Sequence, residues 1–216
     1  MKITALSAQV KNPDRVNVFV DGRFHFSLDI AQIVDLEVKV GLEVSAEQLS
    51  ELAKESEFGK LYLQALNYCL LRPRSVRELR DYLWRKTLPT KYKTKKGEIK
   101  SRAGVSIELV DQVLSKLQQK RYLDDYKFAK WWVENRFLKK GVSARRLRQD
   151  LVKKGIAKDL IDEVLASSTR RDNGELQKVL IKKAQRYTDP QKLIAYLVRQ
   201  GFDYDDVKQA VVELER

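Results

Sequence analysis

The chain has 216 residues, of which 43% are hydrophobic and 34% are charged, and its formal net charge is +13. This balance is typical of a folded globular protein and too apolar for wholesale disorder. The sequence contains no run of about 18 apolar residues and no secretory signal, so we expect a cytoplasmic protein. With a single cysteine, Cys69, we expect no internal disulfide.

The positive charge is concentrated in the middle of the chain. Residues 59–104 contain thirteen basic and three acidic residues, whereas residues 1–58 are net negative. A basic excess of this kind attracts phosphate backbones and acidic protein surfaces at long range. We therefore expect a large acidic partner in preference to a small ligand.

Residues 1–57 predict a small α+β region. The runs "VNVFV" and "FHFSL" flank Asp21-Gly22, which is a strong hairpin signal, and "ITALSAQV" is a candidate third strand. One or two helices are expected through "SLDIAQIVDL" and "SAEQLSELAKESE", and a separate helical segment is expected from Gly59.

The rest of the chain contains an internal repeat. The stretch "SARRLRQDLVKKGIAKDLIDEVL" from Ser143 aligns with "DPQKLIAYLVRQGFDYDDVKQAV" from Asp189 at a constant offset of 46 residues. An earlier copy begins with "SVRELRDYLWRK" at Ser75, contains 17 extra residues and resumes with "VSIELVDQVL" at Val105. Each copy follows a further helical segment, which predicts three tandem three-helix repeats (58–123, 124–168 and 169–216) in an elongated, curved and mainly α-helical array.

Local signals mark where the repeat helices begin and end. Ser75, Ser143 and Asp189 are good N-caps, and Gly155 and Gly201 follow the expected helix ends, where a left-handed residue is favoured. In the following helices, Ser106 and Asp203 are expected to serve as caps, whereas Ala157 at the equivalent position is not.

The 17 extra residues lie within a basic insertion at residues 87–104. We expect it to form a flexible arm or a loose hairpin. Its cations could contact DNA phosphates, or it could be a solvated loop. The basic residues of this arm are Lys91, Lys93, Lys95, Lys96, Lys100 and Arg102.

The helix expected from Asp125 is apolar on two faces. One face includes Trp132, and Phe128 and Trp131 lie on the other. Two interpretations remain open. The second face packs against a neighbouring repeat, or Phe128 and Trp131 form an exposed apolar anchor for a partner.

Residues that carry out catalysis are scarce. His25 is the only histidine, the glycines form no phosphate-binding loop, and the paired acids Asp124-Asp125 and Asp205-Asp206 fall at expected helix starts. We therefore expect a binding protein with no enzymatic activity, no cofactor and no metal.

Three sequence elements occur in a characteristic order. They are R-x-R-S-x-x-E-L-x-x-x-L from Arg72 to Leu83, L-D-D-x-x-F-A from Leu123 to Ala129, and a glycine and leucine pattern from Gly141 to Ile156. In these elements the chain resembles the RecX family of bacterial recombination regulators over residues 59–214, and its N-terminal hairpin is similar to the extension of longer members. The insertion at 87–104 departs from the compact first repeat of that family.

The resemblance implies RecA as the partner. A family member of this kind would bind the RecA filament on DNA in its helical groove and modulate, most often inhibit, strand exchange, ATP hydrolysis and co-protease activity. We expect a monomer with no membrane partner. The alternative is a stand-alone protein that binds single- or double-stranded DNA through basic helix pairs and the lysine-rich arm.

Basic residues crowd equivalent helix junctions in the first two repeats. They are the candidate contacts for RecA or DNA: Arg72, Arg74, Arg77, Arg80, Lys139, Lys140, Arg145, Arg146, Arg148, Lys153 and Lys154.

Overall fold

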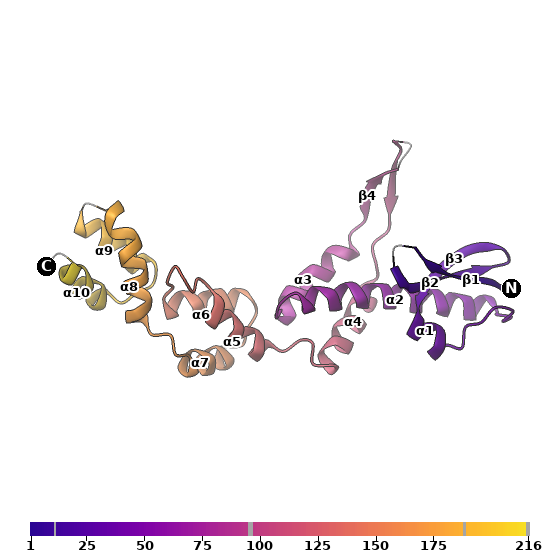
Figure 1. Cartoon of the computed structure of the whole chain (residues 1–216), viewed down its shortest axis with the longest axis horizontal. Coiled ribbons are helices and arrows are strands. Elements are labelled where there is room, and N and C mark those ends of the chain that lie inside the picture. Colours follow the sequence, from indigo (N-terminus) through magenta and orange to yellow (C-terminus); the bar gives the residue numbers. More distant parts are fainter. Residues whose placement is uncertain (11, 95–96, 188, 215–216) are drawn as a thin grey trace. The chain divides into compact units, whose positions relative to one another are not determined.

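A computed structural model describes residues 1–10, 12–94, 97–187 and 189–214 (Figure 1). In these residues the chain forms ten α-helices and five β-strands. The prediction of a mainly helical chain with a small N-terminal strand region is confirmed. The chain divides into two compact units, Met1–Arg72 with Leu79–Tyr122 and Pro73–Glu78 with Leu123–Arg216. Among the described helices, none combines the length and apolar character needed to cross a membrane.

The N-terminal strands form an antiparallel sheet in the order β1 (Ile3–Gln9), β2 (Asn12–Val20) and β3 (Arg23–Asp29). Asp21 and Gly22 both have positive φ angles, of 47° and 77°, as a two-residue type I′ hairpin turn requires. The predicted hairpin and third strand are therefore confirmed.

Two helices follow this sheet, α1 (Ile30–Asp35) and α2 (Ala46–Leu70). The prediction of a separate helix from Gly59 was wrong, because α2 continues through this glycine. Gly59 is buried, and a β-carbon placed there would lie 2.4 Å from Oε1 of Gln32. The glycine thus admits the Gln32 side chain, which donates a hydrogen bond to the Glu55 carbonyl oxygen (2.6 Å).

Along the chain, the helices can be grouped by the three predicted repeats. The first consists of the end of α2 with α3 (Val76–Thr87) and α4 (Ile107–Gln119); the second of α5 (Asp125–Asn135), α6 (Ala144–Lys153) and α7 (Lys158–Ser167); the third of α8 (Asp172–Lys183), α9 (Pro190–Arg199) and α10 (Tyr204–Leu214), with a 3-10 turn at Ala184–Arg186. The second and third repeats each enclose a hydrophobic core of their own.

The predicted caps are present. The hydroxyls of Ser143 and Ser106 accept hydrogen bonds from backbone N–H groups in the first turns of α6 and α4. Asp203 does the same for α10, whereas Ala157 provides no side-chain cap for α7. Gly155 has a φ of +79° at the end of α6, as a left-handed C′ residue should.

The basic insertion forms an antiparallel hairpin of β4 (Thr90–Lys93) and β5 (Ile99–Arg102), which stands away from the helices of its own unit (Figure 1). Its hairpin form agrees with the sequence-based prediction. Lys95 and Lys96, two of the predicted contacts, lie outside the described residues.

The two adjacent tryptophans belong to the second repeat. Phe128 is fully buried, and Trp132 is 9% exposed, in the core that α5, α6 and α7 share. Trp131 is partly exposed and packs against this core. Neither of the two interpretations left open holds for Phe128, because its ring fills the interior of its own repeat.

Candidate partner-binding surface

In the unit that contains Leu123–Arg216, neighbouring repeats are joined by serine hydroxyls between helix ends. Ser143 caps α6 through the Arg146 amide (3.2 Å) and donates its own proton to the carbonyl oxygen of Gln200, the C-cap of α9 (2.7 Å). The start of α6 therefore faces the end of α9. This arrangement satisfies groups that helix ends leave without partners and brings the positive end of one helix dipole next to the negative end of the other.

The same contact occurs between α6 and the segment Pro73–Glu78, which carries the first turn of α3 and belongs to this unit. Ser75 accepts from the Glu78 amide (3.1 Å) and donates to the carbonyl oxygen of Lys154, the C-cap of α6 (2.9 Å). The junction is thus a repeated device, with Ser75 and Ser143 in equivalent positions.

A carboxylate adds a second bond to each junction. Asp172 accepts from the Ala144 amide (2.8 Å), and Asp125 accepts from the Val76 amide (2.9 Å). Burial raises the pKa of both aspartates, despite these hydrogen bonds. Two independent bonds therefore fix the start of one helix against the next repeat.

Close backbone approach brings arginines to these junctions. A β-carbon on Gly201 would lie 3.3 Å from Cβ of Arg145, and one on Gly155 would lie 2.9 Å from Cβ of Arg77. Both arginines are exposed overall. The alkyl part of each side chain lies on the glycine turn of the next repeat, which places the guanidinium at the junction.

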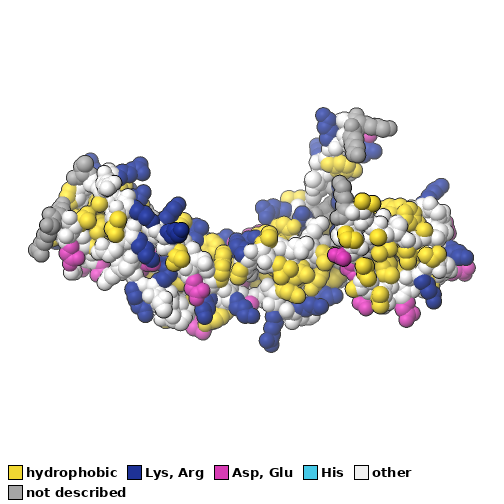
Figure 2. Space-filling view, viewed as in Figure 1, with side chains coloured by type: hydrophobic (Ala, Val, Ile, Leu, Met, Phe, Trp, Pro, Cys, Tyr) yellow, Lys and Arg dark blue, Asp and Glu magenta, His cyan; other side chains and the backbone are white. Residues whose placement is uncertain are grey.

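Two hollows lie where the second and third repeats meet, one on each side of Arg146 and Gln200. The first, of about 470 Å³, has the aromatic rings of Phe137 and Tyr196 in its lining; the second, of about 350 Å³, is polar. Figure 2 shows Lys and Arg side chains gathered in this part of the unit. We call their basic lining the seam surface: Lys140, Arg145, Arg146, Lys153, Lys182, Lys183 and Arg199.

The seam surface carries little opposing charge. Of the residues that line the two hollows, only Asp150 is acidic, and it pairs with Arg136 (3.4 Å). Cations also lie over the rings, with Lys183 Nζ 5.7 Å from the centre of Tyr196. In the described residues these seven cations form no ion pair, and they lie beside the partly buried rings of Phe137 and Tyr196. Such a surface suits an acidic macromolecule with planar or phosphate groups.

Some predicted contact residues instead form ion pairs with acidic residues of the same chain. Glu78 pairs with Lys154 (2.6 Å) and lies 3.9 Å from Arg74, and Arg148 pairs with Asp162. Arg80 and Lys139 are exposed, whereas Arg72 is half-buried. The structure thus brings Lys140, Arg145, Arg146 and Lys153 together on the seam surface and gives Arg74, Arg148 and Lys154 internal partners.

The sequence-based prediction missed Lys182, Lys183 and Arg199. Arg199 stands 46 residues after Lys153, so the repeat alignment contained a signal for it. Lys182 and Lys183 reach the surface from the end of α8, and only the packing of α8 beside the second repeat reveals them. Within the described ranges, no cluster of His, Cys, Asp or Glu could hold a metal ion.

Comparisons with known proteins support one family. Residues 1–45 match the regulatory protein RecX N-terminal domain, and residues 124–165 match the family described as RecX, second three-helix domain. The chain is 30% identical to regulatory protein RecX of Bacillus licheniformis and 28% identical to that of Listeria innocua. These alignments cover 99% of this chain and 77% and 76% of the relatives.

Solved structures agree in fold. A crystal structure of regulatory protein RecX superposes with a TM-score of 0.69 at 21% identity and covers 98% of both chains. RecX from Lactobacillus salivarius superposes with a TM-score of 0.55 at 20% identity and covers 74% of this chain and 97% of that one. On its sequence match over nearly the whole chain, the protein belongs to the RecX family of regulatory proteins.

Proposed function

We propose that this protein regulates the RecA recombinase by binding the RecA filament on DNA, and that the seam surface is its principal contact. The partner is inferred from the family and the contact from the charge of the seam surface. Binding in the filament groove would curb strand exchange, ATP hydrolysis and co-protease activity.

The observation that carries the proposal is the repeated serine junction. Because Ser143 fixes the start of α6 on the end of α9, the cations of these helices lie beside one another. Charges that serve only to keep a surface solvated would not need to be held in fixed positions beside one another. A row of cations held by buried hydrogen bonds is suited to an extended acidic partner.

The test is the DNA-dependent ATPase of RecA on single-stranded DNA, with the protein added at stoichiometric ratios. We expect the wild-type protein to lower the ATPase rate. A variant with Arg145→Glu, Lys153→Glu and Arg199→Glu should need about tenfold more protein for the same effect, because reversed charges oppose association. These exposed side chains make no ion pair within the described residues, so the variant should fold.

A matched control reverses three exposed lysines of the same unit that do not line the hollows, Lys130, Lys158 and Lys208. It changes the net charge equally and should act like the wild type. An unchanged ATPase rate with wild-type protein would refute the proposed function, and equal loss in both variants would refute the seam surface as the contact.

The second candidate function is direct nucleic-acid binding without RecA. The rings of Phe137 and Tyr196 beside lysines favour it, because aromatic rings and cations together bind single strands. Tight binding of single strands by the protein alone, with an affinity that falls steeply with salt, would support this alternative.

A further inference from the structure

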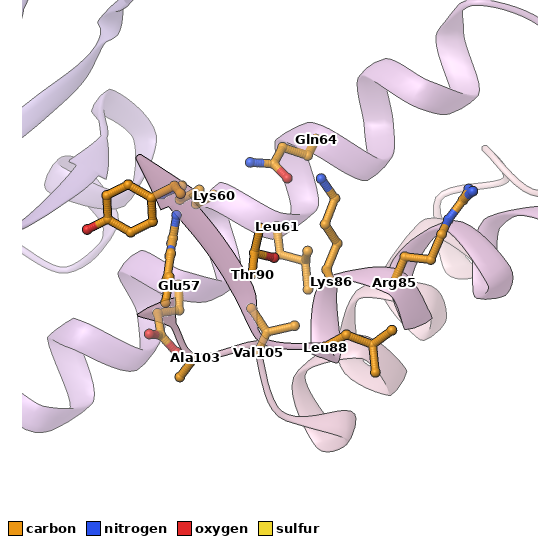
Figure 3. A pocket seen from close by; sticks show the side chains of 12 residues that line it. Glu57, Lys60, Leu61, Gln64, Arg85, Lys86, Leu88, Thr90, Ala103 and Val105 are labelled. Atoms are coloured by element: carbon orange, nitrogen blue, oxygen red, sulfur yellow. The ribbon is translucent and has the colours of Figure 1, made fainter. Parts of the chain in front are cut away.

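A second basic pocket lies in the other unit, at the base of the β4–β5 hairpin (Figure 3). Its volume is about 490 Å³, within the range of about 300 to 1,000 Å³ typical of small-ligand sites. Leu61 of α2, Leu88 and Val105 provide apolar lining, and Tyr92 of β4, which is 49% exposed, adds an aromatic ring.

The shape of this pocket is set by close backbone contacts. A β-carbon on Gly104 would lie 1.9 Å from the carbonyl oxygen of Thr87, so only glycine permits the two ends of the insertion to cross there. The Val105 amide donates to the Lys86 carbonyl oxygen (3.0 Å) beside this crossing. The hairpin base is therefore fixed to the end of α3, and Tyr92 is held next to the apolar lining.

Four cations surround the apolar lining: Lys60 of α2, Arg85 and Lys86 of α3, and Arg102 of β5. In Figure 3 Lys86 extends toward Gln64, whereas Arg85 points away from it. Glu57 is the one acidic residue of the lining, and in the described part of the chain Lys60, Arg85 and Arg102 form no ion pair.

These cations lie close enough for their positive charges to repel one another. Burial and the positive charges of Arg102 and Arg15 lower the pKa of Lys60. Arg15 is itself 6% exposed, and one of its guanidinium nitrogens, Nη1, has no hydrogen-bond partner among the described residues. An anion in the pocket would relieve this repulsion.

We propose that this pocket binds one nucleotide unit of a single-stranded nucleic acid, with the base against Tyr92 and the apolar lining and the adjoining phosphates on Lys60, Lys86 and Arg102. The apolar lining and the ring provide for the base, and the cations provide for the phosphates. A duplex keeps its bases stacked and cannot place one here. Lys91, Lys93 and Lys100 lie on the two strands of the hairpin. Figure 2 shows Lys and Arg side chains on the hairpin, and positive charge that continues beyond the pocket favours a strand over a free nucleotide.

This inference goes beyond the proposed function, because it requires no RecA. Its test measures the fluorescence anisotropy of a labelled oligothymidylate with the purified full chain alone. Replacing Lys60 and Arg102 by Gln should weaken binding about tenfold. The matched control replaces Lys39 and Lys54 by Gln, which removes the same charge from exposed lysines of the same unit outside the pocket lining.

The control should lose far less affinity than the pocket variant. Equal losses in the two variants would overturn the pocket as the site and leave only an effect of net charge. The four substituted residues are exposed, so folding should be preserved, and circular dichroism melts verify it.

A second arm of the experiment tests the place of the base. Wild-type protein should bind oligothymidylate about tenfold more tightly than an abasic strand of equal length, and Tyr92→Ala should abolish most of this preference. Equal binding of the two strands by the wild type would overturn the seating of a base.

Competitors distinguish other ligands. Neither oligoglutamate nor ATP should displace the strand at concentrations at which unlabelled oligothymidylate does. Displacement by oligoglutamate would overturn the proposal in favour of an acidic peptide, and displacement by ATP would overturn it in favour of a free nucleotide. Failure of the RecA assay with the seam variants leaves these results unaffected, so the two proposals fail separately.

Discussion

Glu175 shows how a single charged residue can organise a repeat junction. It is 3% exposed, and its carboxylate accepts from the Val142 amide (3.1 Å), from Lys178 (2.8 Å) and from Arg170. Arg170 also donates to the carbonyl oxygens of Val133 (2.6 Å) and Arg136 (2.8 Å) at the end of α5. One buried pair therefore links α5, the following loop and α8, and provides partners for the end of a helix.

The sequence did not reveal this role. Glu175 stands near the start of an amphipathic segment, where an acidic residue ordinarily complements the helix dipole and remains solvated. Its burial depends on Arg170, which lies five residues earlier in the chain, and on the backbone around Val142, which lies 33 residues earlier. A local pattern contains no information on such a partner.

Glu175 also predicts a pH dependence of stability. Burial alone would raise the pKa of Glu175, but the hydrogen bonds from Arg170 and Lys178 and the positive charge of Arg170 outweigh it and lower the pKa below its ordinary value. A carboxyl whose pKa is lower in the folded state stabilises the fold above its unfolded pKa. This stabilisation is lost as the pH falls through the folded value.

The substitution Glu175→Gln isolates this contribution. At neutral pH it should cost about 3 kcal/mol, because Arg170 is left buried without its counter-charge. The cost should shrink as the pH falls below the ordinary pKa of a glutamate, about 4.3, and should disappear below the lowered folded value, where the wild-type carboxyl also becomes neutral. Urea denaturation of both proteins from pH 7 to pH 3 measures it, and a cost that does not change with pH would contradict the assignment.

At the scale of helices, the sequence was most informative where structure is local. The hairpin at Asp21-Gly22, the caps and the glycine helix ends depend on neighbouring residues, and all are present. The continuous α2 was not predicted: Gly59, where a new helix was expected to begin, lies inside α2, and its contact with the distant Gln32 could not be read from the local pattern. The serine junctions were foreseen only in part: the cap was predicted, but the bond to the next repeat depends on packing.

The junction bond can be separated from the cap by a matched pair of substitutions. Ser143 and Ser106 both cap a helix, but Ser143 also donates to Gln200 and is 1% exposed, whereas Ser106 is exposed. Ser106→Ala should cost about 1 kcal/mol, the usual value of an N-cap. Ser143→Ala should cost about 1 kcal/mol more, because the Gln200 carbonyl loses its buried donor.

A third variant, Ser143→Asp, keeps a capping oxygen but has no proton to donate at neutral pH. Asp189 occupies this position in the third repeat, where it caps α9. We expect Ser143→Asp to be at least as destabilised as Ser143→Ala in urea denaturation. Equal costs for Ser106→Ala and Ser143→Ala would show that the junction bond contributes nothing.

At the scale of the whole chain, composition predicts an acidic partner but does not say which residues would contact it. Of the basic residues of 59–104, Lys60, Arg85, Lys86 and Arg102 line the pocket at the base of the β4–β5 hairpin, while the seam surface lies in the other unit. Ion pairs explain part of the difference between the predicted contact residues and the cations of the seam surface. Arg148 and Lys154 look like free cations in the sequence, yet the fold gives them acidic partners.

Co-sedimentation with RecA filaments assembled on single-stranded DNA tests the central claim most directly. Wild-type protein and the Lys130, Lys158 and Lys208 control should pellet with the filaments, and the variant reversed at Arg145, Lys153 and Arg199 should remain mostly in the supernatant. The charge-reversed variant pelleting as fully as the wild type would contradict the assignment of the seam surface as the filament contact.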